Sequence, residues 1–457
     1  MSTSASNGTA TATRTGTPPG PRGRLLTGSM LDFQRDSLGF IEEVALRHGD
    51  VVRYRMATMW WYQVNHPEGV RRVLQENNHN YPKSDLTASI LRPVVGEGLF
   101  ISEGRTWLQQ RRLMQPAFHR HRIAAFGELM VDATQKMLDR WNPPGRIDVA
   151  AQMTGLTLDV VTDALFHAHV GGEPEAIARA VGTLLAEINH RFQVPFYPPI
   201  SVPTPRNRRM RHAIRTLDRA MYDIIGERRR GGEGDDLLSM LMEARDEETG
   251  AAMSDRQLRD EVITLFIAGH DTTANALTWT LYLLAKNLEA DERLRAELDE
   301  VLDGAVPTVA DLPKLPYGRM VIEEAMRLYP PAWITDRQAV KEDEILGHHI
   351  PAGAHVIISP YVTHRLPTLW EDPEKFDPGR FSPENFAGRP RYAYFPFGGG
   401  PRQGIGKGMA LMEAHLILTT VMQRYRLRLV ASRPVEAQPL ATLRPHGGLP
   451  MTVEPVS

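Results

Sequence analysis

The most regular pattern in this chain is a three- and four-residue spacing of apolar positions, which is the period of an amphipathic helix. The pattern dominates the middle of the chain and is clearest in residues 125–141, 257–288 and 318–329. Strand-like apolar runs cluster instead at the two ends, in residues 49–56, 60–64, 354–362 and 449–456. The sequence therefore predicts a mainly α protein with a small β-rich region.

Residues 262–285 are apolar, and the segment is long enough to raise the question of a membrane span. Polar groups near the middle of a span are costly in lipid. This segment carries several of them, at His270, Asp271, Thr272, Thr273 and Asn275. We therefore expect a long helix buried in the protein core.

The first 26 residues are rich in Ser, Thr, Gly and Pro, and they contain neither an acidic residue nor the apolar run of a secretory signal. This composition predicts a disordered tail over residues 1–17 and no membrane anchor. Because no repeat and no interdomain linker follows the tail, we expect residues 18–457 to form a single domain.

Charge and cysteine content exclude several classes of protein. The 53 Lys and Arg nearly balance the 55 Asp and Glu, and a net charge of -2 argues against a nucleic-acid-binding protein. The chain has no cysteine, which excludes disulfides, thiolate metal sites, iron–sulfur clusters and a cysteine nucleophile.

Residues 268–273, Ala-Gly-His-Asp-Thr-Thr, place a glycine, an acid and two hydroxyls halfway along the predicted long helix. Glycine weakens a helix locally, and a Thr hydroxyl can bond to the carbonyl one turn earlier and bend it. A bend would open a polar groove in which Asp271 and Thr272 hold water and pass protons. A buried acid satisfied by a cap or a salt bridge is an equally good interpretation of this motif alone.

Two further pairs lie at helical spacing. Glu324 and Arg327 share a helix face, and such a pair is usually a solvated surface contact. Trp107 and Arg111 lie one turn apart in a basic run. That run is either a solvated face or a site that binds an anion or a carboxylate.

Residues 395–408, Phe-Pro-Phe-Gly-Gly-Gly-Pro-Arg-Gln-Gly-Ile-Gly-Lys-Gly, form a glycine-rich loop ahead of a predicted helix. A phosphate-binding P-loop would need Gly where Pro401 stands and Ser or Thr where Gly408 stands. The glycines also fail the spacing of a dinucleotide-binding motif. The loop is therefore not expected to bind a nucleotide.

Taken together and in order, these motifs resemble the cytochrome P-450 family over nearly the whole chain. The resemblance rests on Trp107-x-x-x-Arg111, Ala268-Gly-x-Asp-Thr-Thr273, Glu324-x-x-Arg327, Asp377-Pro-Gly-Arg-Phe381 and Phe397-x-x-Gly400-x-Arg402-x-Gly404-x-Gly406. It implies a mainly α cytochrome P-450 fold with a small β-rich region. It also implies haem b bound between a long distal helix and a proximal helix.

The resemblance further implies roles for individual residues. Asp271 and Thr272 would be the catalytic pair that serves oxygen activation. Glu324, Arg327 and Arg380 would form a buried structural network. The haem, including its propionates, would be bound by Trp107, Arg111, Arg337, Phe397, Arg402 and Gly406.

One position departs from the family pattern. The family has a cysteine, the axial iron ligand, where this chain has Gly404, and no other cysteine exists to replace it. Gln403 is a poor ligand, His415 lies beyond the loop, and His270 is interpreted as a variable groove residue rather than a distal ligand. We therefore expect haem b to bind without an axial protein ligand, and monooxygenase activity to be severely reduced.

The leading hypothesis is a bacterial-type, cytoplasmic and monomeric monooxygenase scaffold. It would use O2 and electrons from a ferredoxin or flavodoxin to hydroxylate or oxidise a hydrophobic molecule of terpenoid, fatty-acid or polyketide type. The redox partner would dock near Arg112, Arg120, Arg122 and Lys407, although a solvated face is also a reasonable interpretation of these residues.

Four segments are expected to line the substrate pocket, residues 84–100, 188–203, 331–336 and 445–450, because they are apolar and aromatic with few charges. The alternative hypothesis is a haem-free homologue that activates a partner enzyme by binding it. Haem-independent chemistry in the substrate pocket is a third possibility.

Overall fold

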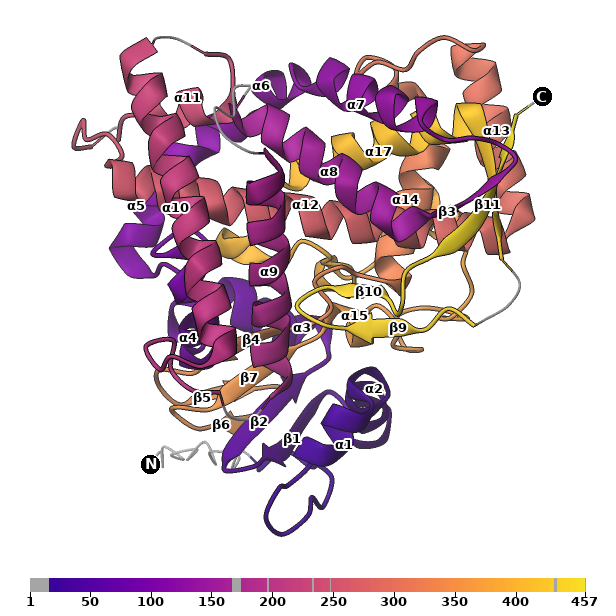
Figure 1. Cartoon of the computed structure of the whole chain (residues 1–457). Coiled ribbons are helices and arrows are strands. Elements are labelled where there is room, and N and C mark those ends of the chain that lie inside the picture. The colour runs from indigo at the N-terminus through magenta and orange to yellow at the C-terminus, as the bar shows by residue number, and fades with distance from the viewer. Residues whose placement is uncertain are drawn as a thin grey trace, which may run out of the picture.

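Helices dominate the molecule and form its upper part in Figure 1. The computed structural model describes residues 16–166, 174–194, 197–231, 234–246, 248–430 and 434–456. The helices are α1 (Met30–Arg35), α2 (Ser37–His48), α3 (Pro67–Arg71), α4 (Asp85–Val95), α5 (Gly104–Met114), α6 (Arg120–Ala124), α7 (Gly127–Asp139), α8 (Val149–Phe166), α9 (Pro174–Gln193), α10 (Pro205–Gly231), α11 (Leu237–Glu243), α12 (Asp255–Lys286), α13 (Leu288–Leu302), α14 (Pro316–Leu328), α15 (Pro360–Thr363), α16 (Pro383–Phe386) and α17 (Lys407–Arg424).

The strands form small sheets. They are β1 (Val51–Met56), β2 (Met59–Val64), β3 (Gly145–Asp148), β4 (Thr335–Gln338), β5 (Asp343–Ile345), β6 (His348–Ile350), β7 (His355–Ile358), β8 (Tyr425–Leu429), β9 (Ala437–Pro439), β10 (Leu443–Pro445) and β11 (Pro450–Pro455). The largest sheet has the order β1-β2-β7-β4, and the others are β3-β11-β8 and the hairpins β5-β6 and β9-β10. Strands from the two ends of the chain meet in the largest sheet, where β2 pairs with β7 in parallel and Tyr62 lies opposite Val356.

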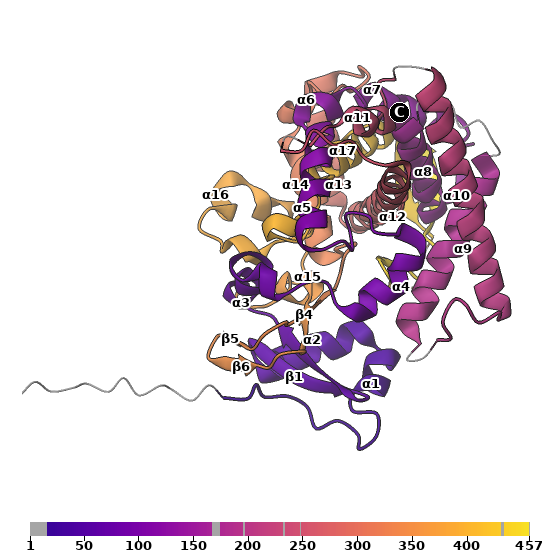
Figure 2. The ribbon, with the colours of Figure 1, turned by 90° about the vertical axis from the view of Figure 1, so that its left-hand side faces the viewer.

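The long apolar segment forms one uninterrupted helix, α12. Its N-cap Ser254 accepts a hydrogen bond from the Gln257 backbone N–H at 3.2 Å, which satisfies a donor that the first turn leaves unpaired. Figure 2 views α12 nearly end-on, with α8 and α17 close by and α9 and α10 to one side. Buried residues occur all around α12, as expected for a helix enclosed by protein. No described helix is long and apolar enough to cross a membrane.

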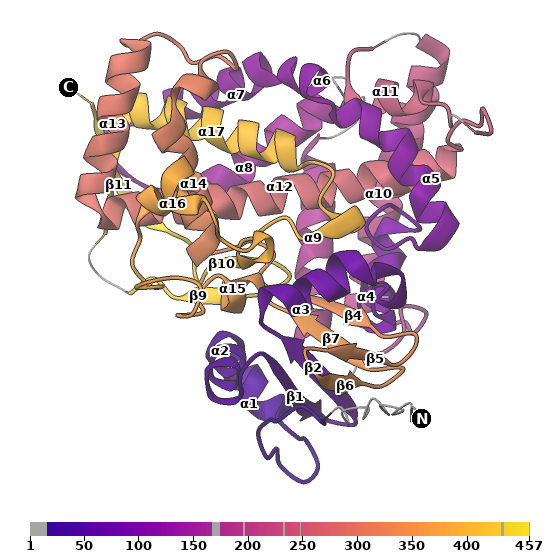
Figure 3. The ribbon, with the colours of Figure 1, turned by 180° about the vertical axis from the view of Figure 1, so that it is seen from behind.

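The proximal region is built around α17, which lies behind α12 in the view of Figure 1 and is seen in front in Figure 3. Nearly every residue from Met409 to Met422 is buried, and α17 packs on α7, α12 and α14. The apolar side chains of these helices belong to one hydrophobic cluster. This packing fixes the position at which the glycine-rich loop enters α17.

Most of the predicted elements are present, with one clear error. Residues 354–362 were expected to be a strand, but β7 ends at Ile358 and α15 begins at Pro360. Pro360 sits at the first helical position, where its missing N–H costs nothing, and the Ser359 hydroxyl accepts a hydrogen bond from the Val362 backbone N–H at 3.3 Å. Local capping therefore stops the strand earlier than its apolar composition suggested.

The predicted tail, residues 1–17, lies outside the described residues as far as residue 15. Gly16 is described, and its carbonyl accepts a hydrogen bond from the His349 backbone N–H at 3.2 Å. The first described residue of the chain therefore contacts the β5-β6 hairpin.

Candidate active site

A cavity of about 1540 Å³ lies between α12, α17, the glycine-rich loop and the largest sheet. It exceeds the roughly 300–1,000 Å³ of ordinary ligand sites, so it has room for a large cofactor together with a small molecule. Nine residues singled out from the sequence line this one cavity. They are Trp107, Arg111, Asp271, Thr272, Arg337, Phe397, Arg402, Gly404 and Gly406.

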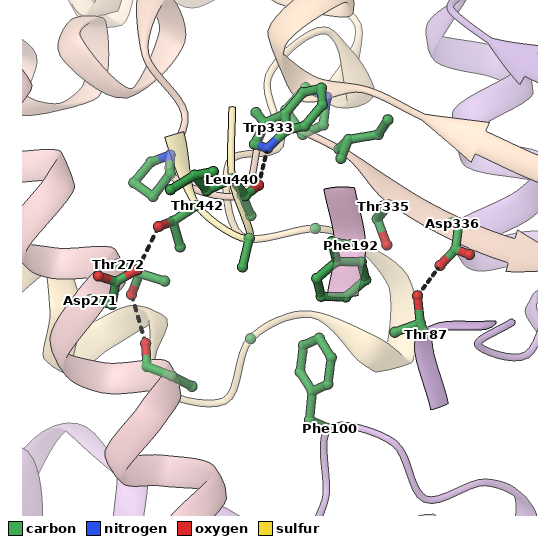
Figure 4. Close-up of a pocket in the computed structure, with 18 of the residues that line it drawn as sticks. Thr87, Phe100, Phe192, Asp271, Thr272, Trp333, Thr335, Asp336, Leu440 and Thr442 are labelled. Atoms are coloured by element: carbon green, nitrogen blue, oxygen red, sulfur yellow. Dashed lines mark hydrogen bonds between the residues drawn. The ribbon is translucent and has the colours of Figure 1, made fainter. Parts of the chain in front are cut away.

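Asp271 and Thr272 lie midway along α12 at the cavity wall (Figure 4). The Asp271 carboxylate accepts a hydrogen bond from Thr442 Oγ1 at 2.5 Å and lies 3.5 Å from Arg444 Nη2. Thr272 Oγ1 donates to the Ala268 carbonyl at 2.7 Å, as expected for a Thr within a helix. Asp271 is thus a buried acid with protein partners, and it also faces the cavity.

Close packing of two helices explains the glycine at position 269. A Cβ at this position would lie 3.3 Å from a methyl group of Val161, so glycine lets α8 approach α12 closely. His270 points away from the site, because it is buried and is not among the described residues that line the cavity. Burial lowers its pKa, and its ring packs 6.2 Å from that of Phe266. His270 is therefore not placed to act as a distal ligand.

Positive charge gathers on one wall of the cavity. Arg402 donates to the Ser102 carbonyl at 2.6 Å, pairs with Glu103, and stacks its guanidinium 4.4 Å from the Trp107 ring centroid. Arg111 Nη1 donates to the Gln403 carbonyl at 2.9 Å. The indole and both guanidiniums are therefore held at the wall by the loop residues around them.

Arg337 extends this cationic wall from β4. Its Nη1 donates to Thr335 Oγ1 at 2.8 Å and to the Asp336 carbonyl at 2.7 Å. Burial lowers the pKa of Arg337 to about 10, and Asp336 opposes part of that shift. The guanidinium is buried with too little negative charge around it.

Lys83 belongs to the same wall and was missed in the sequence analysis. Burial, followed by repulsion from Arg337, holds the pKa of its ammonium well below the usual range. Its only sequence signal is an isolated lysine just before the apolar helix α4. The cationic cluster is therefore Lys83, Arg111, Arg337 and Arg402, and the carboxylates beside it are Glu103 and Asp336.

The excess positive charge makes this wall fit a ligand that carries carboxylates. Burying an unpaired cation is costly, and Arg guanidiniums match carboxylates with forked hydrogen bonds. The two propionates of haem would supply the missing negative charge. The residues of this wall therefore fit the propionate end of that cofactor.

The glycine-rich loop is shaped by left-handed backbone at Gly398 (φ 70°) and Gly400 (φ 61°). A Cβ on Gly400 would lie 1.8 Å from the Leu74 carbonyl oxygen, so only glycine fits there. The Gly404 N–H then donates to the Phe397 carbonyl at 3.0 Å, and α17 begins three residues later. These contacts turn the loop so that Phe397, Gly404 and Gly406 face the cavity.

Gly404 differs from those glycines because nothing in the structure requires it. Its φ is not positive, and a Cβ built on it would meet nothing closer than the Phe397 carbonyl oxygen at 3.7 Å. A side chain would therefore fit without strain. Glycine has no side-chain atom that could bind iron, so the residue present at position 404 does not supply the axial ligand of a haem.

His415 is not placed to replace the missing ligand. His415 is buried against Gly318 and is not among the described residues at the cavity, and burial lowers its pKa to about 4. The described residues hold no group of His, Asp and Glu side chains suited to a metal ion.

Glu413 was also missed from the sequence. It lies on α17, is only 5% exposed, and lines the cavity. No described residue is hydrogen-bonded to its carboxyl, and burial raises its pKa to about 8. An acid inside an apolar helix, in Leu-Met-Glu-Ala-His-Leu, was the signal that could have found it.

Glu324 and Arg327 lie outside the cavity and are both 0% exposed, so the surface-contact interpretation of this pair is wrong. Arg327 donates to the two carboxylate oxygens of Glu324 at 2.7 and 2.9 Å, and also to the carbonyls of His364, Pro373 and Lys375. Arg380 Nε lies 3.5 Å from the same carboxylate. These contacts tie α14 to the segment that carries Asp377-Pro-Gly-Arg-Phe381.

The pocket segments were predicted with partial success. Residues from 84–100, 188–203 and 331–336 line the cavity, although Pro195 and Phe196 lie outside the described residues. Residues 445–450 do not line it, because β10 ends at Pro445 and the chain then leaves for β11. Their place is taken by residues 436–442 around the β9–β10 turn, where the Trp333 indole donates to the Leu440 carbonyl at 2.8 Å (Figure 4).

Comparison with known proteins agrees with this geometry. The cytochrome P-450 family model matches residues 18–449. Cyclooctatin synthase of Streptomyces melanosporofaciens is 37% identical over 95% of both chains, and pentalenene oxygenase of Streptomyces avermitilis is 34% identical over 94% of both chains. The crystal structure of a cytochrome P-450 haem domain superposes with a TM-score of 0.87 at 26% identity, covering 96% of this chain and 98% of that one.

The mainly α fold and the cavity beneath α12 thus define a haem-monooxygenase architecture. The chain belongs to the cytochrome P-450 family of haem-dependent monooxygenases.

Proposed function

We propose that this chain is a cytochrome P-450 scaffold for the O2-dependent hydroxylation or oxidation of a hydrophobic small molecule, with turnover severely reduced by Gly404. One observation carries the proposal. The buried Arg337 and the partly buried Lys83 and Arg402 face the same cavity as Asp271 and Thr272, while Gly404 brings no ligand atom to it. The site therefore has the cations that would bind the haem propionates but lacks the protein atom that would bind the iron.

In this proposal the cationic cluster and the Trp107 indole bind the haem propionates, and Phe397 and Gly406 contact the ring. Haem b, when bound, supplies the O2-activating chemistry. Asp271 would take up and release protons at its carboxylate, and the Thr272 hydroxyl, which donates to the Ala268 carbonyl, keeps a free lone pair that can accept a hydrogen bond from a bound molecule. The apolar walls exclude water from the reacting carbon.

The substrate we propose is a terpenoid. The apolar lining suits any hydrophobic molecule. A relative named cyclooctat-9-en-7-ol 5-monooxygenase is 37% identical over 96% of this chain, and pentalenene oxygenase is similarly close. These names favour a terpenoid over a fatty acid or a polyketide.

A ferredoxin or flavodoxin is the proposed electron donor. Arg112, Arg120 and Arg122 are exposed on α5 and α6, at the end of α17 where the glycine-rich loop enters. Their positive charge suits an acidic partner. Arg112 already pairs with Glu248 at 2.6 Å, so it would have to exchange partners on docking.

Haem titration of the purified protein, followed by absorption spectra with and without CO, tests the proposal. We expect one haem to bind and the ferrous–CO spectrum to lack the red-shifted Soret band of thiolate ligation. Arg337→Gln should weaken haem binding by about 10-fold or more, since it removes a charge-assisted contact. The exposed Arg208→Gln is the matched control. Appearance of the red-shifted band in the unaltered chain would overturn the assignment of Gly404.

The second candidate is a haem-free auxiliary protein that activates a partner enzyme, and the bare Gly404 position favours it. The same titration separates the two. Failure of the purified chain to bind haem, with a stable complex to a partner enzyme, supports the auxiliary role.

A further inference from the structure

Arg191 brings a positive charge to the cavity from an element that takes no part in the cationic cluster. It lies in the last turn of α9 and is 5% exposed. Its neighbours Ile188, Phe192 and Val194 line the same wall and are apolar. A guanidinium in such surroundings is costly unless a partner compensates its charge.

Two contacts with uncharged groups hold the Arg191 side chain. Nη2 donates to Asn207 Oδ1 at 2.7 Å, and the guanidinium carbon lies 4.7 Å from the Tyr197 ring centroid. Asn207 is itself fixed, because its Nδ2 donates to the carbonyls of Pro199 and Val202, both at 2.8 Å. Arg191 is therefore positioned in advance by the segment that joins α9 to α10.

No carboxylate pairs with Arg191 among the residues that the structure describes. The acid one turn earlier on α9, Glu187, is already taken by Arg206 at 3.4 Å and Arg209 at 3.9 Å. Arginine carries five N–H donors, and the described residues use one of them. A fixed, buried cation with free donors at a cavity wall indicates an anionic group on the ligand.

We propose that Arg191 binds the carboxylate of a hydrophobic carboxylic acid in this cavity, an inference that rests on the proposed function. The guanidinium fork matches a carboxylate with two parallel hydrogen bonds, which fix orientation as well as position. A substrate of this class has to be supplied by an earlier reaction that creates the carboxyl group. This chain would then act late in the oxidation of its substrate.

The β9–β10 turn relates this head-group site to the catalytic pair. Asn189 Oδ1 on α9 accepts a hydrogen bond from the Ala441 N–H at 2.8 Å, and the next residue, Thr442, donates to Asp271. The turn therefore spans the distance between α9 and α12. A ligand with its carboxylate at Arg191 would lay its hydrocarbon body along this turn toward Asp271.

Calorimetric titration with abietic acid and abietinol tests the proposal, because the two share one tricyclic skeleton and differ in a carboxyl against a hydroxymethyl group. At pH 8, where the acid is ionised, we expect the unaltered chain to prefer abietic acid by about 10-fold to 100-fold. Arg191→Gln should abolish this preference and leave abietinol binding unchanged. Arg191→Lys should keep part of it, because the charge remains and the fork is lost.

Two control variants separate recognition from folding. The exposed Arg208→Gln should retain the full preference. Asn207→Ala loosens the same segment and releases the Arg191 guanidinium without removing the cation, so it should weaken the binding of both ligands and retain part of the preference for the acid. Equal loss of both ligands in Arg191→Gln would show a structural role and overturn the proposal.

Other outcomes are equally decisive. Equal affinity of the unaltered chain for the two ligands overturns the role of Arg191 and leaves the proposed function intact. Acid binding that survives Arg191→Gln but is lost in Arg337→Gln places the carboxylate at the cationic cluster, which also overturns it. If neither ligand binds, the hydrophobic-substrate part of the proposed function fails as well.

Discussion

The Asp271 carboxylate accepts a hydrogen bond from the Thr442 hydroxyl at 2.5 Å, although 171 positions separate the two residues. The contact joins the middle of α12 to the β9–β10 turn. Thr442 Oγ1 also accepts a hydrogen bond from Asn275 Nδ2 at 3.2 Å, and Asn275 lies one turn beyond Asp271 on α12. The acid proposed to move protons is therefore held in one orientation by a segment near the end of the chain.

This arrangement predicts the behaviour of Asp271→Asn. The amide keeps the shape of the side chain but cannot take and return a proton, and loss of a general acid–base group costs about 100-fold or more. In a Gly404→Cys background, we expect product formation per O2 consumed to fall by that order while ligand affinity stays unchanged. Thr442→Val, which removes only the orienting hydroxyl, should cause a smaller loss. An Asp271→Asn variant with undiminished turnover would refute the proton role.

Gly404→Cys should restore the ligand that the loop lacks. The Cβ has room, with its nearest neighbour 3.7 Å away, and the backbone conformation is open to any L-residue. We expect the red-shifted Soret band of the ferrous–CO protein to appear, together with measurable turnover. Gly404→Ala is the control, because it fills the same space without a sulfur atom and should show neither. If the cysteine variant folds and binds haem without the band, the loop serves another purpose.

Glu324→Gln should destabilise the fold strongly. Arg327 is fully buried, and loss of its charged partner leaves an uncompensated guanidinium in the core. Breaking a buried ion pair from one side costs about 3–5 kcal/mol in the free energy of unfolding. The adjacent Glu323→Gln breaks a more exposed pair with Arg319 and should cost about 1 kcal/mol or less. Urea denaturation of both variants checks the difference, and equal losses would contradict it.

Glu413 predicts a pH dependence of stability. Its pKa in the folded protein is raised to about 8 from the ordinary value of 4.5, so the folded state holds its proton more tightly than the unfolded state. The stability that the protonated carboxyl contributes is complete below about pH 4.5 and is lost as the pH rises toward 8. The unfolding free energy of Glu413→Gln should therefore gain on that of the unaltered chain between pH 5 and 8. The exposed Glu292→Gln should show no such trend, and a constant difference for Glu413→Gln would contradict the shift.

The motifs of this family are short and local, which is why the chain alone was enough to recognise them. Apolar periodicity located α7, α12 and α14 because a buried helix face repeats every three to four residues whatever it packs against. The spacing of Phe397, Gly400, Arg402 and Gly406 likewise identified the loop. The same spacing showed that Gly404 stands where the family has its axial cysteine.

Other features required contacts between segments that are distant along the chain. Lys83 and Arg191 carry no distinctive local pattern, and Glu413 is marked only as an acid within an apolar helix. The meaning of all three comes from their surroundings on other elements. Residues 436–442 line the cavity because the β9–β10 turn passes over α12. No local sequence pattern predicts this path. The same holds for Glu324 and Arg327: spacing placed them on one face, but the carbonyls of three residues beyond position 360 decide that this face is buried. Desolvation and charge compensation depend on what surrounds a group in space, and that is why tertiary structure was needed for them.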